Sequence, residues 1–254
     1  MEYKFYQTYI NLLEEDRIKR NKLITYKSLD VNHKPVDFDF ERKLLNFDFR
    51  KFVLNKLGYN IETIKMIIPA IQGNMLRPQR LFIDKEDFYV ACDMITNTYY
   101  ICYKNLMMID IDFYKNKDQD KEYIIEQFEK DNNNCWKLYL TRNGIHAFLV
   151  SKKINYHSDE SLKLMLNFKR QKYTTDEKTI DDTLCDFYYI LYSYIRGFCV
   201  RLNKKKDEEK MEYLFIQYTG NKDLIDINLD KLVNLHIDYI HLFTNHGISL
   251  MAGQ

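Results

Sequence analysis

Glycine, proline and long apolar runs are scarce in this sequence of 254 residues. With seven glycines and three prolines, long flexible linkers are not expected. The sequence has no run of about 18 apolar residues, which argues against a membrane-spanning helix, and its charged N-terminus does not resemble a signal peptide. These absences predict an intracellular, soluble protein of the cytoplasm or nucleus with no membrane partner.

The cysteines also lack a recognisable arrangement. None of the five forms a C-x-x-C pair, so a cysteine-rich zinc site is not expected. Their odd number and scattered positions predict reduced thiols in a reducing compartment. The formal net charge is only +1, and any contact with nucleic acid must therefore come from local basic patches. The abundance of Tyr, Lys, Asn and Ile reflects AT-rich coding, which would suit a large DNA virus or a mobile element.

Hydrophobic periodicity divides the chain into a helical beginning and a strand-rich remainder. Helical patterns at residues 2–20 and 38–57, and a short element at 60–68, precede a change of period near residue 80. Later runs predict strands at 81–94, 98–103, 105–114 and 211–219, hairpins at 135–151 and 186–202, and helices at 118–131, 158–170 and 229–243. The expected fold class is therefore α+β, with a helical portion (1–70) packed on a mixed or antiparallel sheet core (71–254).

A pair of carboxylates lies inside one predicted strand. The segment MMIDIDFY places Asp110 and Asp112 two residues apart among apolar residues. The two-residue period of a strand puts both side chains on one face, with Ile109 and Ile111 on the other. Because neighbouring carboxylates repel, the pair favours a divalent cation, Mg²⁺ or Mn²⁺, between them. A polar, solvated face is the competing interpretation, and the apolar flanks favour the metal.

A histidine follows a tight turn in the next predicted hairpin. The segment TRNGIHAF places His146 two residues after Gly144, with Arg142 in the turn. A histidine there can donate to phosphate oxygens, an arginine can neutralise their charge, and the glycine lets backbone approach a ligand closely. For the histidine alone, an ordinary hairpin with a surface side chain is the better interpretation.

Taken in order, these motifs resemble the archaeo-eukaryotic primase superfamily. Its catalytic core carries an hhhDhDhh strand, then a strand entered through a Gly-x-His or Ser-x-His turn, then a hydrophobic–Asp motif. Asp110 and Asp112 match the first motif, and Gly144 with His146 matches the second. The resemblance covers about residues 77–220 and implies an RRM-like core. It also implies that the acids ligate two metals while the histidine contacts the phosphates of the incoming nucleotide.

The third acid of that pattern is implied by the same resemblance. Asp186, in TLCDFYYILY, precedes an Arg- and Lys-bearing segment as the third acid does in the family. Asp226, in DLIDINLD, also follows apolar residues, and Asp181 and Asp182 are further alternatives. Asp186 is the expected metal ligand.

Basic residues complete the expected nucleotide site. The resemblance implies that Arg201 and Lys204, in GFCVRLNKK, bind the nucleotide. Arg142 occupies a turn position where family members often carry a basic residue. Arg77 and Arg80, in MLRPQRLF, lie where many members place an arginine that holds the triphosphate.

The leading hypothesis is a template-dependent nucleotidyltransferase of DNA replication, of DNA primase or primase-polymerase type. Its partners would be nucleoside triphosphates and a single-stranded template, with template contacts from basic patches at 152–153, 169–172 and 204–206. For each patch taken singly, a solvated surface is the better interpretation. The sequence carries no zinc motif and no helicase portion, so a separate helicase or large subunit is a compatible partner. The alternative is a non-catalytic primase-fold protein with a nucleic-acid-binding or structural role. A D-x-D metal-dependent glycosyltransferase is less favoured, because the helical first 60 residues supply no nucleotide-binding βαβ region.

Overall fold

The computed structural model of the chain describes residues 57–74, 79–93, 96–113, 117–170, 183–203 and 213–246. Contacts divide the chain into two compact units, residues 1–76 and 77–254. The helices expected at 2–20 and 38–57 lie outside the described residues. Among the helices that are described, none is long and apolar enough to cross a bilayer.

Helix α4 (Ile61–Asn74) is the described helix of the first unit. Asn60 caps its N-terminus, since its side-chain oxygen accepts a hydrogen bond from the Thr63 backbone N–H at 2.9 Å. The sequence predicted a short element that ends before Pro69, whereas the helix continues through that residue to Asn74.

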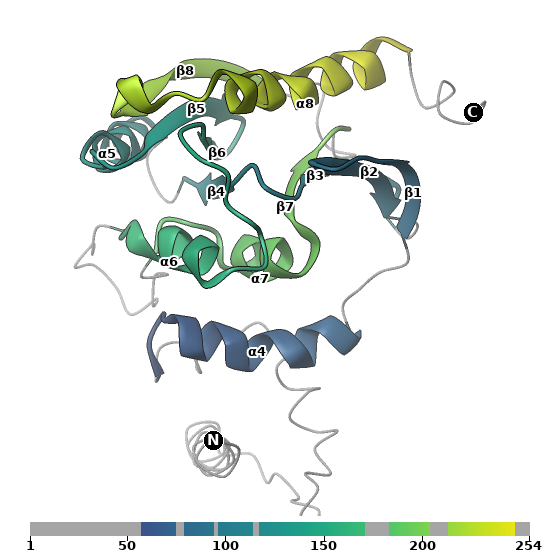
Figure 1. Cartoon of the computed structure of the whole chain (residues 1–254), viewed down its shortest axis with the longest axis horizontal. Coiled ribbons are helices and arrows are strands. Elements are labelled where there is room, and N and C mark those ends of the chain that lie inside the picture. The colour runs from purple at the N-terminus through teal and green to yellow at the C-terminus, as the bar shows by residue number, and fades with distance from the viewer. Residues whose placement is uncertain are drawn as a thin grey trace, which may run out of the picture. The chain divides into compact units, whose positions relative to one another are not determined.

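The second unit is α+β, with two four-stranded antiparallel sheets (Figure 1). The first sheet has the strand order β1-β2-β3-β7. Its strands are β1 (Gln79–Asp84), β2 (Phe88–Asp93), β3 (Thr98–Tyr103) and β7 (Phe198–Arg201). The single run expected at 81–94 is thus a hairpin, because the charged residues 85–87 form its turn and the Lys85 N–H donates to the Phe88 carbonyl at 2.8 Å.

The second sheet has the strand order β4-β6-β5-β8, so β4 and β8 are its edges. Its strands are β4 (Met108–Asp112), β5 (Cys135–Thr141), β6 (Gly144–Leu149) and β8 (Tyr213–Gly220). Because β4 directly follows β3 in the chain, the backbone passes from the first sheet into the edge of the second.

Helix α8 (Ile227–His246) lies over one face of the second sheet (Figure 1). Its Asp230 forms an ion pair with Lys137 at 2.9 Å, and its His236 ring stacks on Phe148 with centroids 5.0 Å apart. Burial lowers the pKa of His236 to about 3, so this ring is neutral in the core.

The opposite face of the second sheet packs against aromatic side chains. Trp136 of β5 contacts Phe128 of helix α5 (Lys117–Glu129) and Phe168, which ends helix α6 (Asp159–Asn167). The Phe128 and Phe168 rings stack with centroids 4.1 Å apart. The second sheet is therefore packed on both sides, by α8 on one face and by the aromatic side chains of α5 and Phe168 on the other.

The hairpin expected at 186–202 is wrong in its first half, which is helix α7 (Phe187–Arg196). Residues Phe187, Ile190, Leu191 and Tyr194 are buried, and their spacing of three or four is that of a helix face. Aromatic and β-branched composition favoured a strand, but tertiary burial of this face decides for the helix. Gly197, at φ +99°, ends the helix and allows β7 to begin.

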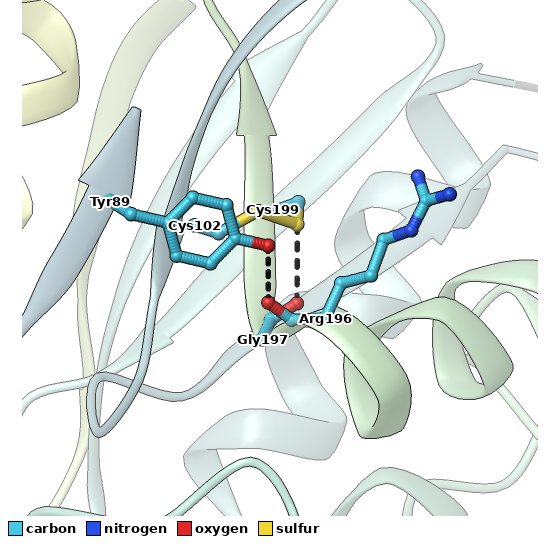
Figure 2. The surroundings of a disulfide bond; sticks show 5 residues. All are labelled: Tyr89, Cys102, Arg196, Gly197 and Cys199. Atoms are coloured by element: carbon cyan, nitrogen blue, oxygen red, sulfur yellow. Dashed lines mark hydrogen bonds between the residues drawn. A yellow bond between two sulfur atoms is a disulfide. The ribbon is translucent and has the colours of Figure 1, made fainter. Parts of the chain in front are cut away.

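The expectation of reduced cysteines is wrong for two of the five. Cys102 and Cys199 face each other across β3 and β7 and form a disulfide (Figure 2). Beside it, the Tyr89 hydroxyl donates to the Arg196 carbonyl at 2.7 Å (Figure 2). Scattered positions in the sequence could not show that these two residues are direct cross-strand partners. The remaining three cysteines are buried free thiols.

Candidate active site on strands β4 and β6

The register of β4 and β6 brings the acid and histidine motifs together. Asp110 lies directly opposite His146, and Asp112 lies directly opposite Gly144. Directly opposite residues point to the same face of a sheet. Asp110 Oδ1 and His146 Nε2 are 3.2 Å apart, and their side chains are 33% and 16% exposed. The two motifs therefore meet at one partly open position beside a sheet edge.

Gly144 is needed because the two strands approach unusually closely. A Cβ atom at this position would lie 1.9 Å from the Ile111 carbonyl oxygen and 3.1 Å from the Asp112 Cα. The sequence predicted that this glycine admits a ligand, whereas its immediate neighbour is the β4 backbone. Absence of a side chain at Gly144 is thus what lets the two strands pair beside Asp110.

Tyr213 holds the far side of the histidine ring, and sequence reasoning missed it. Its hydroxyl lies 2.7 Å from His146 Nδ1. Nε2 faces a carboxylate oxygen and is placed to donate to it, which leaves Nδ1 placed to accept from the tyrosine hydroxyl. Burial, followed by neighbouring tyrosines and Asp110, raises the pKa of Tyr213 well above its usual range. The tyrosine therefore stays protonated and can act as that donor.

Asp186 lies on the other side of β4 from His146. Its backbone N–H donates to the Asp110 carbonyl at 2.7 Å, and its carboxylate caps α7 by accepting from the Tyr189 N–H at 2.8 Å. The rival Asp226 caps α8 instead. Its backbone N–H donates to the carbonyl of Val150, a residue that follows the end of β6, four residues after His146. Of the two, Asp186 is the one placed beside Asp110.

The rivals Asp181 and Asp182 lie outside the described residues, as do the candidate nucleotide-binding residues Arg77 and Lys204.

Tyr189, on the first turn of α7, contributes a buried hydroxyl near the same acids. Within the described part of the chain this hydroxyl has no hydrogen-bond partner. Burial raises the pKa of Tyr189 well above its usual range, and the nearby Asp110 carboxylate adds to that rise. Its hydroxyl is therefore a proton donor that stays neutral beside the acids.

Arg170 supplies positive charge at the open end of β4. Its guanidinium donates to the Asp112 carbonyl at 3.2 and 3.3 Å and to the Leu184 carbonyl at 3.4 Å. The sequence assigned this arginine only to a template-binding patch. Its contact with Asp112 depends on two segments that are far apart in the chain, so no local motif could show it.

The other arginines expected at the site are more widely spread. Arg142 is exposed in the turn between β5 and β6. Arg80 and Arg201 belong to the first sheet, where Arg201 pairs with Tyr100 and the Arg80 guanidinium lies 5.3 Å from the Phe82 ring centroid. No hydrogen bond or ion pair described for the second unit joins either of them to Asp110.

The carboxylates of Asp110 and Asp112 supply some, but not all, of the ligands that a divalent cation needs. Within the residues that are described, no group of three or more His, Cys, Asp or Glu side chains is close enough to hold a metal ion. Asp110 is partly exposed and Asp112 is exposed, so both are accessible. Mg²⁺ is commonly held by one or two carboxylates together with water and substrate phosphates. The donor set therefore fits a metal that arrives with a phosphate ligand better than an ion held by protein alone.

The β4 edge of the second sheet presents two accessible carboxylates, an oriented imidazole and a guanidinium. Such a combination can bind a phosphate-bound cation and stabilise phosphate charge. Comparison of the chain with protein-family models, with curated proteins and with solved structures finds no match.

Proposed function

We propose that this chain is a metal-dependent nucleotidyltransferase of primase or primase-polymerase type. The observation that carries the proposal is the direct cross-strand pairing of Asp110 with His146. A D-x-D strand and a Gly-x-His strand are separate motifs in the sequence, and a shared nucleotide site requires them to be neighbours on one face. Their 3.2 Å contact meets that requirement.

Asp110 and Asp112 would hold the cation, Mg²⁺ or Mn²⁺. When bound, that cation would activate the attacking 3′-hydroxyl and neutralise charge on the triphosphate. Asp186, whose backbone bonds to that of Asp110, would be the third acid.

His146 and the nearby arginines would bind the triphosphate. The Nε2–H that faces Asp110 can donate to a phosphate oxygen, while the Tyr213 hydroxyl keeps the ring in that orientation. Arg170, beside Asp112, and Arg142, in the exposed turn, can add charge-assisted hydrogen bonds to phosphate.

The test is incorporation of labelled nucleotides on primed and unprimed single-stranded templates, with Mg²⁺ or Mn²⁺. Wild type is compared with an Asp110→Asn/Asp112→Asn variant and with Asp223→Asn, which changes an exposed carboxylate remote from the β4 strand. We expect the double variant to lose incorporation and the control to retain it. Melting curves should show that all three proteins are folded.

Two results would overturn the proposal. Incorporation that survives in the double variant would refute the assignment of the acids. A folded wild type that binds nucleotide but incorporates none, in either metal and on either template, would favour the non-catalytic alternative.

A further inference from the structure

Phe215 is an exposed aromatic side chain at the β8 edge of the sheet face that α8 partly covers. It lies on the edge strand β8 and is 51% exposed, although its partner on β5, Tyr139, is only 2% exposed. Its ring touches Tyr139 and Tyr218, with centroids 5.8 and 5.4 Å apart. The ring is therefore held in place by two tyrosines while about half of the side chain meets solvent.

This ring belongs to the same face and the same cross-strand row as the candidate site. The register pairs Asp110 with His146, His146 with Tyr139, and Tyr139 with Phe215. With strands about 4.8 Å apart, Phe215 lies roughly 10 Å from His146, measured between their strands. One row of residues thus leads from the candidate site to the exposed ring.

The aromatic contacts along this row have no break. The Tyr213 ring lies 5.3 Å from the His146 ring and 5.1 Å from the Tyr139 ring, which in turn contacts Phe215. The neighbours of Phe215 on its own face are two tyrosines, which have polar ends, and Lys137, whose Nζ lies 5.8 Å from the ring centroid. The next exposed apolar residue, Leu214, points to the opposite face because adjacent strand residues alternate. A single ring among tyrosines and a lysine offers little to an apolar protein partner and suits a flat, amphipathic base.

We propose that Phe215 is a stacking platform for a base of a single-stranded nucleic acid. Stacked nucleotides advance by roughly 3.4 Å along one strand, so the base on Phe215 would lie two or three nucleotides from the one beside His146. The inference rests on the proposed function, and it identifies the partner that the same sheet face would bind.

Direct binding tests the platform without any need for catalysis. The probe is a fluorescein-labelled single-stranded DNA of ten nucleotides, titrated with protein at one fixed low salt concentration and followed by anisotropy. The variants are Phe215→Ala, Phe215→Leu and Phe215→Trp, with Leu214→Ala as the matched control on the same strand. Because both residues are more than half exposed, melting curves should change little.

Loss of one base stack weakens binding by about 5- to 140-fold. We expect this loss for Phe215→Ala and Phe215→Leu, wild-type affinity for Phe215→Trp, and less than a twofold change for Leu214→Ala. A second measurement places 2-aminopurine at successive template positions, where stacking quenches its fluorescence. Quenching that depends on Phe215 should be greatest two or three nucleotides from the primer end.

The outcomes separate this inference from the proposed function. Equal affinity of wild type and Phe215→Ala, or of wild type and Phe215→Leu, would overturn the platform even if nucleotides are incorporated. Binding that depends on Phe215 in a protein that incorporates nothing would support the platform and count against the proposed enzyme. A wild type that does not bind the oligonucleotide would overturn the platform outright.

Discussion

Gly144→Ala is the substitution whose effect follows most directly from the pairing of β4 with β6. A Cβ atom at residue 144 would lie 1.9 Å from the Ile111 carbonyl oxygen, and real contacts of this kind essentially never fall below 3.0 Å. The strands must therefore separate locally by at least 3.0 − 1.9 = 1.1 Å. Backbone has to move, because no flexible side chain can yield instead.

Gly144→Ala should lower the free energy of unfolding by about 3 kcal/mol, the upper end of the range for overpacked sites. For a protein of this size that corresponds to a melting temperature lower by roughly 6–12 °C. The displaced pair, Asp112 with Gly144, is the next pair on the same sheet face after Asp110 with His146, with one pair between them. Activity should therefore fall even at temperatures where the variant remains folded, since a shift of about 1 Å at a catalytic contact can reduce the rate on the order of 100-fold.

The measurements are urea denaturation followed by circular dichroism, and nucleotide incorporation well below the melting temperature. Thr141→Ala, on the other strand of the same hairpin, is the control and should cost less than about 1 kcal/mol. A Gly144→Ala protein within about 0.5 kcal/mol of wild type would refute the close approach of β4 and β6 on which the site is built.

Three further perturbations test the contacts around the site and the disulfide. Tyr213→Phe keeps the ring but removes the hydroxyl that lies 2.7 Å from His146 Nδ1. We expect the free energy of unfolding to fall by about 1 kcal/mol and the ¹⁵N chemical shifts of the His146 ring to change. Unchanged shifts would contradict the contact. His236 has a pKa of about 3 in the folded protein, below the unfolded value near 6.5. Its contribution to the free energy of unfolding is therefore complete above about pH 6.5. Below that pH the contribution is lost at about 1.4 kcal/mol per pH unit. His236→Phe should therefore show a smaller loss of stability between pH 7 and pH 5, and equal losses would refute neutral burial. Reduction of Cys102–Cys199, which closes a separation of 97 residues, should cost about 2–4 kcal/mol in urea melts, and a Cys102→Ser/Cys199→Ser variant should not respond to the reductant.

Local sequence patterns were sufficient for most of the second sheet. The apolar run around Asp110, the strand–turn–strand pattern from Cys135 and the aromatic run from Tyr213 are all strands, and the last amphipathic segment is α8. The Ser158 cap of α6 was also expected, and its side chain accepts from the Ser161 N–H. In these segments the period and the capping residue both favour the observed element.

Long-range relations could not be predicted from the same patterns. The sheet order β4-β6-β5-β8 is set by packing. The spacing of residues in the sequence therefore could not show which residue of the neighbouring strand lies opposite Asp110. Tyr213 reaches His146 across 67 residues, and Arg170 reaches Asp112 across 58. The resemblance supplied the pairing of acid and histidine, but it named neither of these supporting side chains.

The Cys102–Cys199 disulfide has a consequence for the topology of the molecule. Asp110, His146 and Asp186 all lie between its two cysteines in the sequence, so the chain that carries them is a covalently closed ring. A single cut in any peptide bond of that ring would open it without releasing a fragment. The nicked protein would keep its full mass on a non-reducing gel, and the strands that carry the acids and the histidine would remain joined while the chain refolds.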